Sequence, residues 1–216
     1  MTDWYRRLIH ATCLILSMIA ASAPIVASDA AMVEVVASER PAAWAVPLVK
    51  PGLPNIHRLT DKLYRGAQPT AAGMKQLEAM GIKTVLSFRA FHDDDEELAG
   101  TGLASERISF KTWHPERHEV VRFLEIVTDP AKQPVFVHCL HGADRTGMMC
   151  AIYRITQQGW PKDEAVREMV EGGYGFHSVW TNLIAFVREL DTEALKRAQP
   201  AATAAEAVGA AGAAEP

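Results

Sequence analysis

Hydrophobic residues between positions 55 and 197 follow two patterns that alternate along the chain. Short apolar runs between turn residues are typical of buried strands, and apolar residues three and four positions apart are typical of amphipathic helices. The first pattern predicts strands at residues 63–65, 83–89, 107–110 and 135–137, and the second predicts helices at 70–81, around 120–127, from about Arg145, and at 162–170 and 179–190. Strands that alternate with helices predict an α/β fold, with a mostly parallel central sheet flanked by helices.

The acidic stretch His92–Leu98, "HDDDEEL", interrupts this alternation. Its charge predicts a solvated loop that leads into a short helix. Hard-cation sites usually space their ligands by one residue or draw them from several segments, so three adjacent aspartates do not predict a metal site. We therefore expect no metal.

The N-terminus has the pattern of a secretory signal peptide. Arg6 and Arg7 precede an apolar stretch, Leu8–Ala21, and small residues follow it. Cleavage sites of the expected kind follow Ala23, Ala27 and Ala30. The apolar stretch is shorter than the ~20 residues of a membrane-spanning helix. Residues 1–30 are therefore predicted to be a signal peptide, and the mature chain to be periplasmic or secreted without a stable membrane span. The alternative is an uncleaved N-terminal anchor in the inner membrane.

Residues 31–54 and 198–216 differ in composition from the segment between them. The first contains several prolines and no clear hydrophobic period. It is predicted to be a leader segment, of which one piece could dock on the domain. The second is rich in alanine and has almost no large apolar side chains, which predicts a disordered tail. One domain, residues 55–197, remains between them.

Composition and cysteine content narrow the possible functions. A net charge of -4 and 22% charged residues describe an ordinary soluble surface, and without a block of Lys and Arg no nucleic-acid partner is expected. Removal of the signal peptide leaves Cys139 and Cys150, too few for a disulfide framework. Cys150 follows a helical pattern and is predicted to be a small buried hydrophobe. Cys139 is then a free thiol in an oxidising compartment, which is a liability unless the thiol is needed.

The loop "CLHGADR", residues 139–145, joins a predicted strand to a predicted helix. Such a loop aims its backbone N–H groups at one point, and Gly142 lets the backbone approach a ligand closely. The resulting nest binds a phosphate-sized anion, to which Arg145 can add two charge-assisted hydrogen bonds. The same positive environment is expected to lower the pKa of the Cys139 thiol from about 8.5 to roughly 3.5–7.5. A thiolate beneath a phosphate site implies nucleophilic attack on phosphorus.

The stretch "HCLHGADRTG" resembles the HCxxGxxRTG signature of the protein tyrosine phosphatase superfamily. The likeness is to the compact dual-specificity class, covers roughly residues 55–191, and includes "LYRGAQPT" and "GGYGFHSVW". It implies a tyrosine-phosphatase-like fold with a Cys-x5-Arg phosphate loop. Cys139 would be the nucleophile, and Arg145 would bind phosphate and stabilise the transition state. His138 would hold the loop and help lower the pKa of the thiol, and Thr146 would hydrogen-bond the sulfur. The substrate-binding residues implied are His138, Leu140, His141, Gly142, Ala143, Asp144 and Arg145.

The chain departs from the family at the general acid, which is usually an aspartate that precedes the cysteine. No aspartate occurs between Asp95 and Asp129. The candidates in the expected loop are His114, Glu116 and Glu119. We favour Glu116, because Pro115 begins a helical turn that could hold it near the phosphate loop. Glu119 is expected to face solvent on that helix, and His114 could cap it.

Asp144 is a second departure. An acidic residue in the rim of the loop should discourage very highly charged substrates, unless it orients Arg145 instead. His141, at the same rim, could offset it as a cation at low pH.

The resemblance implies a cofactor-free, monomeric cysteine-dependent phosphatase that acts on phosphorylated proteins or small phosphomonoesters. Phosphotyrosine is the leading substrate, and the activity could extend to phosphoserine and phosphothreonine. The enzymatic alternative is an inositol-phosphate or phosphoinositide phosphatase, favoured by Asp144 and by the missing aspartate acid. A phosphate-binding pseudophosphatase is a third hypothesis, against which the intact Cys139, Arg145 and Thr146 argue.

Overall fold

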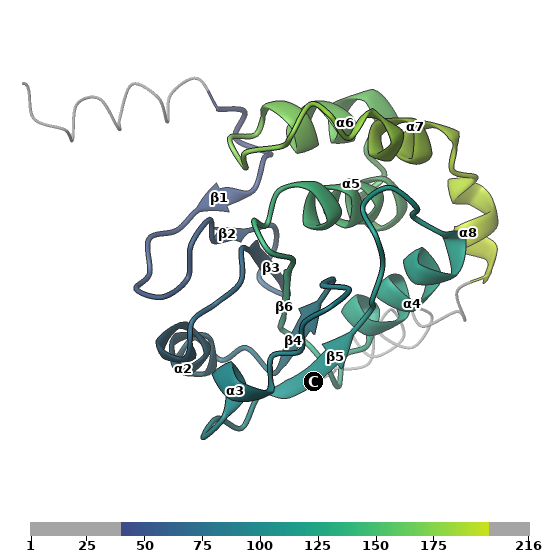
Figure 1. The fold of residues 1–216 in the computed structure, drawn as a ribbon. Helices are drawn as coiled ribbons and strands as arrows, with labels where there is room; N and C mark the ends of the chain where they lie inside the picture. Colours follow the sequence, from purple (N-terminus) through teal and green to yellow (C-terminus); the bar gives the residue numbers. More distant parts are fainter. Residues whose placement is uncertain (1–39, 199–216) are drawn as a thin grey trace, which may run out of the picture. The chain divides into compact units, whose positions relative to one another are not determined.

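The computed structural model describes residues 40–198 of the chain (Figure 1). The predicted signal peptide, the first part of the predicted leader and the predicted tail beyond Ala198 lie outside the described residues. Among residues 40–198, no helix is long and apolar enough to cross a membrane.

A mixed six-stranded sheet forms the centre of the described chain, in the order β1-β2-β3-β6-β4-β5. The strands are β1 (Val46–Pro47), β2 (His57–Arg58), β3 (Leu63–Gly66), β4 (Thr84–Ser87), β5 (Ala104–Arg107) and β6 (Val135–His138). β1, β2 and β3 pair antiparallel, whereas β3, β6, β4 and β5 pair parallel. The carboxyl ends of the parallel strands therefore meet at one edge of the sheet, where α/β proteins usually bind their ligands.

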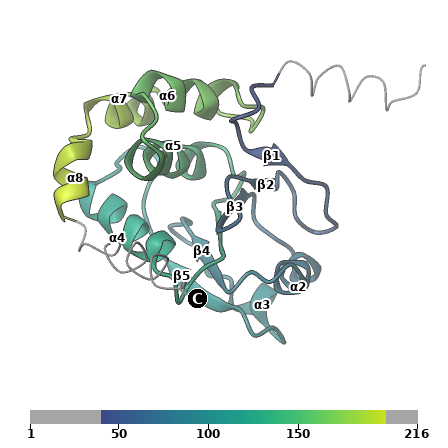
Figure 2. The same ribbon diagram turned by 180° about the vertical axis from the view of Figure 1, so that it is seen from behind.

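Helices cover both faces of this sheet, as the sequence predicts. They are α2 (Ala71–Ala79), α3 (Asp95–Leu98), α4 (Arg117–Thr128), α5 (Asp144–Gln158), α6 (Lys162–Glu171), α7 (Thr181–Glu189) and α8 (Thr192–Ala198). Helices α4 to α8 lie on one face, and α2 and α3 lie on the other (Figures 1 and 2). Successive residues of β6 point to opposite faces, so Val135 and Val137 enter one hydrophobic core and Phe136 enters the other.

The strands predicted around residues 63–65, 83–89 and 135–137 are confirmed as β3, β4 and β6, and the five predicted amphipathic helices are confirmed as α2 and α4 to α7. The short helix predicted with the acidic stretch is α3, which begins inside that stretch at Asp95. The strand predicted at 107–110 is wrong, because β5 ends at Arg107. β5 is a largely exposed edge strand, so no apolar run marks it. Ile108 and Phe110 are buried after the strand ends, which explains the misplaced prediction. The sequence analysis also did not predict α8.

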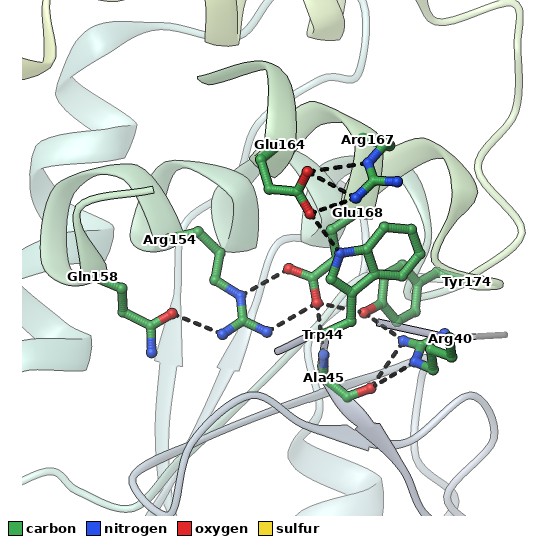
Figure 3. Close-up of polar contacts among 9 residues, drawn as sticks. All are labelled: Arg40, Trp44, Ala45, Arg154, Gln158, Glu164, Arg167, Glu168 and Tyr174. Carbon is green, nitrogen blue, oxygen red and sulfur yellow. Dashed lines mark hydrogen bonds and ion pairs between the residues drawn. The ribbon is translucent and has the colours of Figure 1, made fainter. Parts of the chain in front are cut away.

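Residues 40–45, within the predicted leader, contact α6 and the segment that contains Gly172 and Tyr174 (Figure 3). Trp44 and Ala45 are buried, and the Ala45 N–H donates to Glu168 Oε1 at 2.7 Å. The same carboxylate accepts two hydrogen bonds from Arg154, at 2.7 and 2.9 Å, and one from the Tyr174 hydroxyl at 2.9 Å. One buried glutamate thus joins residues 40–45 to two helices and to the segment that contains Tyr174.

His57 on β2 is a buried histidine that the fold keeps neutral. Its ring meets Tyr174 edge-on at 4.7 Å between centroids, and its Nδ1–H donates to the Asn55 carbonyl at 3.0 Å. Burial, with help from the nearby Arg65 and Arg40 charges, lowers the pKa of His57 from 6.5 to about 4.

This shift predicts a pH-dependent loss of stability. Between about pH 6.5 and pH 4 the unfolded chain binds a proton at His57 and the folded chain does not, so the free energy of unfolding should fall as the pH falls. A shift of this size corresponds to at most about 3 kcal/mol. Urea denaturation at pH 7 and pH 4.5 should show a smaller pH dependence in His57→Phe than in the parent. Equal pH dependence in both proteins would contradict the assignment.

Candidate active site

The phosphate loop, Cys139–Ala143, lies between the end of β6 at His138 and the start of α5 at Asp144. Cys139 is 2% exposed, so its thiol lies at the base of the loop rather than on the surface. The N-terminus of the 15-residue helix α5 adds a positive partial charge at the same place. The strand, loop and helix predicted from the sequence therefore come together as expected.

Gly142 allows the phosphate loop to pack against β3. Its φ is +68°, a left-handed conformation that favours glycine. A Cβ at this position would lie 2.3 Å from the carbonyl carbon of Gly66, the last residue of β3. No larger residue fits without moving the loop or the strand.

His138 is fully buried and connects the loop to the acidic stretch. Its Nε2 lies 2.8 Å from Asp94 Oδ2, and its Nδ1 lies 3.2 Å from the Cys139 carbonyl oxygen. Both partners are oxygen acceptors, one on each side of the ring, so they fix the orientation of the His138 side chain. Asp94 is 2% exposed and also accepts a hydrogen bond from Gln68 at 2.8 Å.

The prediction that the whole acidic stretch is solvated is wrong at Asp94, which is buried. Burial tends to raise the pKa of Asp94, but the hydrogen bonds from His138 and Gln68 and the charge of His138 outweigh it, and the net pKa is lowered. An ionised aspartate therefore pairs with the ring of His138, the residue before Cys139. The sequence gives no signal that separates Asp94 from its exposed neighbours.

Arg145 is oriented by two backbone carbonyls. Its Nη1 donates to Phe88 at 2.8 Å and to Phe110 at 3.3 Å. Its Nε and Nη2 make no hydrogen bond with residues 40–198 and are available to a ligand. Arg145 and seven other residues line one pocket: Arg89, Ala90, Phe91, Lys111, Thr112, Trp113 and Leu140. The lining contains three cations and no carboxylate, which suits an anion.

Thr146 is buried, and its hydroxyl has no hydrogen-bond partner within the described residues. The hydrogen bond to the Cys139 sulfur that the family resemblance implies is not made in this structure. The role of Thr146 in expelling the thiolate stays a prediction.

Asp144 is not a free rim carboxylate, and among the described residues its carboxylate makes no hydrogen bond or ion pair with Arg145. It is 7% exposed, and it accepts hydrogen bonds from the His177 N–H and from His177 Nδ1, both at 2.9 Å. The expectation that Asp144 orients Arg145 is not met, because its carboxylate binds His177, which is distant in sequence. Its expected effect on highly charged substrates stays a prediction. His141 is an exposed rim residue whose ring centroid lies 5.3 Å from that of His177.

The three general-acid candidates lie at the start of α4. Glu116 is the N-cap and forms a capping box with Glu119, whose Oε2 accepts from the Glu116 N–H at 2.6 Å. Glu119 is 6% exposed, so the prediction that it faces solvent is wrong. The capping box turns its side chain back over the helix end, and burial raises its pKa. His114 does not cap the helix, because Glu116 does.

None of these three residues lines the pocket that contains Arg145. All three line an adjoining pocket, which shares Ala90, Phe91 and Lys111 with the first. A proton donor in the second pocket would therefore lie beside a substrate held in the first.

Comparisons with known proteins agree with this site. Residues 57–179 match the family model described as "DSP-PTPase phosphatase fused to NAD+ Kinase". The chain is 36% identical over 166 residues to the dual specificity protein phosphatase TpbA of Pseudomonas aeruginosa, covering 75% of this chain and 73% of that protein.

Solved structures give the same relationship. A crystal structure of P. aeruginosa TpbA has 34% identity and a TM-score of 0.66, covering 73% of this chain and 96% of that one. A cysteine-to-serine form of TpbA in complex with phosphotyrosine has 34% identity and a TM-score of 0.67, covering 74% and 97%. The catalytic core of a PP-IP phosphatase from S. cerevisiae shares the fold, with 22% identity, a TM-score of 0.59, and coverage of 70% and 93%.

Proposed function

The chain belongs to the dual-specificity phosphatase family of the protein tyrosine phosphatase superfamily, and we propose that it hydrolyses phosphotyrosine in proteins through a phosphocysteine intermediate. The observation that carries this proposal is the buried Cys139 at the base of a loop whose arginine faces a cationic pocket. Phe91 and Trp113, both largely exposed, line the same pocket and offer aromatic surface to a tyrosine ring.

The proposed reaction has two displacement steps. The Cys139 thiolate attacks phosphorus, the P–S bond forms, and the bond to the tyrosine oxygen breaks as that oxygen takes a proton from the general acid. Water then attacks phosphorus, the P–S bond breaks, and inorganic phosphate leaves with the thiolate restored. Arg145 and the amides of the phosphate loop stabilise the negative charge of the transferring group in both steps.

Substitution of the nucleophile tests this proposal. Cys139→Ser should abolish hydrolysis of p-nitrophenyl phosphate and still bind inorganic phosphate, whereas Arg145→Ala should lose both. Cys150→Ala is the matched control, because Cys150 lies within α5 outside the phosphate loop, and burial raises its pKa to about 11 and keeps it a thiol. Near-normal turnover by Cys139→Ser would refute the covalent mechanism.

The general acid is proposed to be Glu116, with Glu119 and His114 as alternatives. All three side chains line the pocket beside the catalytic one. The exposed carboxylate of Glu116 favours that residue because a substrate can reach it, and the raised pKa of the buried Glu119 favours Glu119 as a proton donor. Gln serves in a capping box as Glu does, so Glu119→Gln preserves the helix start.

Protonation of the leaving oxygen matters most when that oxygen is basic. Loss of the acid should therefore reduce kcat/KM for a phosphotyrosine peptide by ~10²-fold or more and reduce that for p-nitrophenyl phosphate much less. Glu116→Gln, Glu119→Gln and His114→Asn should be compared on both substrates across pH. Equal, small changes on the two substrates would exclude the substituted residue, and three such results would mean that no side-chain acid acts.

A second candidate function is the hydrolysis of an inositol phosphate or phosphoinositide. Arg89, Lys111 and Arg145 line one pocket without a carboxylate, which also suits a ligand that carries several phosphates. Phosphate release from a phosphotyrosine peptide, a phosphoserine peptide and an inositol polyphosphate should be compared at equal concentrations. A higher kcat/KM for the inositol polyphosphate than for the phosphotyrosine peptide would mean that inositol phosphates, and not phosphotyrosine, are the substrate class.

We also propose that the protein is exported to the periplasm, from the signal-peptide pattern of residues 1–30. The monomeric state expected from the family resemblance stays a prediction. N-terminal sequencing of the chain from an osmotic-shock fraction should give a start after Ala23, Ala27 or Ala30. A full-length chain in the membrane fraction would favour the N-terminal anchor, and one in the cytoplasm would contradict export.

A further inference from the structure

Four consecutive carbonyl groups of the phosphate loop each accept a hydrogen bond. The Cys139 carbonyl accepts from His138 Nδ1 at 3.2 Å, and the Leu140 carbonyl accepts from the backbone N–H of Gln68 at 3.1 Å. The His141 carbonyl accepts from Asn55 Nδ2 at 2.9 Å, and the Gly142 carbonyl accepts from Arg65 Nη2 at 2.6 Å. Every carbonyl between the nucleophile and Gly142 is thus held by its own donor.

These contacts fix the direction of the amides. A trans peptide is planar, so the carbonyl of one residue and the N–H of the next point in opposite directions. Holding the carbonyls of residues 139–142 turns the N–H groups of residues 140–143 to the other side of the loop. Those four amides have no acceptor within residues 40–198, which is the arrangement of an anion-binding nest.

We propose that Asn55 and Arg65 are positioning residues that hold the phosphate loop open to its anion by binding the His141 and Gly142 carbonyls. The inference rests on the proposed function only in that the bound anion is a phosphoryl group. Without such a donor, a carbonyl could rotate toward the ligand and replace an attractive N–H by a repulsive oxygen.

Arg65 is itself held by a chain of buried contacts. It is 1% exposed, and its guanidinium lies over the Tyr174 ring, 3.6 Å from the ring centroid. This cation–π interaction stabilises the buried charge. The Tyr174 hydroxyl donates to Glu168, the carboxylate that also binds Ala45 and Arg154 (Figure 3). Residues 40–45 and the phosphate loop therefore depend on one connected cluster.

Asn55 has a backbone suited to its role. Its φ is +55°, a left-handed conformation that Asn and Gly tolerate. Its Nδ2 donates a second hydrogen bond, to the Tyr174 carbonyl at 2.8 Å, which fixes the side chain on both sides. Asn55→Gly therefore removes the donor while keeping a backbone that fits this conformation.

The test is binding of inorganic phosphate, measured by calorimetry in the Cys139→Ser protein so that no chemistry intervenes. Asn55→Gly and Arg65→Met should each raise the Kd on the order of tenfold, because each frees a carbonyl next to an anion. Arg65→Lys, which keeps a charged donor, should bind more tightly than Arg65→Met. Gln133→Ala is the matched control: its amide donates to the Val127 carbonyl at 2.7 Å, away from the loop, so its Kd should equal that of the parent.

Thermal unfolding of each variant shows whether it is folded, so that a weaker Kd can be assigned to positioning and not to unfolding. A folded Asn55→Gly protein with the Kd of the parent would overturn the proposal, even if Arg65→Met does not fold. Equal Kd values for Arg65→Lys and Arg65→Met would also overturn it. With Cys139 restored, both variants should raise KM for p-nitrophenyl phosphate. The activity of the parent protein tests the proposed function separately. If the parent failed to hydrolyse phosphotyrosine peptides, the proposed function would be wrong. If the Kd for phosphate still depended on Asn55, the positioning role would stand.

Discussion

The direction of the peptide groups in a five-residue turn is the constraint on which this structure depends. An anion site built from backbone works only if the amides face the ligand and the carbonyls face away, and a loop alone has no means to enforce that choice. Here the carbonyls of residues 139–142 are held by donors from His138, Gln68, Asn55 and Arg65. The fold supplies the orientation that the loop lacks.

The order of strands explains why those donors are available. β3 pairs directly with β6, with Arg65 opposite Val137, and β6 ends at His138, one residue before Cys139. Arg65 and the nearby Gln68 therefore lie within reach of the phosphate loop. The absence of a Cβ at Gly142 lets the loop approach Gly66 at the end of β3. β4, on the other side of β6, leads to Phe88, whose carbonyl helps to orient Arg145. Both neighbours of β6 therefore contribute to one site.

Local patterns predicted the elements and the chemistry of the loop, because these depend on residues close in sequence. Periodicity located β6 and α5, and the spacing of Cys139 and Arg145 identified the phosphate loop. Contacts between distant segments were not predictable. In the sequence Asp94 looks like its solvated neighbours, and only the fold shows that it binds His138. Asp144 likewise looks like a rim carboxylate, and only the fold shows that it binds His177. Asn55, Arg65 and Gln68 received no role, since nothing in their own segment identifies their acceptors.

Amide chemical shifts measure the central claim most directly, because they report each N–H group in turn. Inorganic phosphate should be titrated into ¹⁵N-labelled Cys139→Ser protein. The account predicts that the amides of Leu140, His141, Gly142 and Ala143 all move downfield with one shared Kd, as hydrogen bonds to the anion form. Phosphate binding that leaves these four amides unmoved, or that moves only some of them, would contradict a nest held open by its carbonyls.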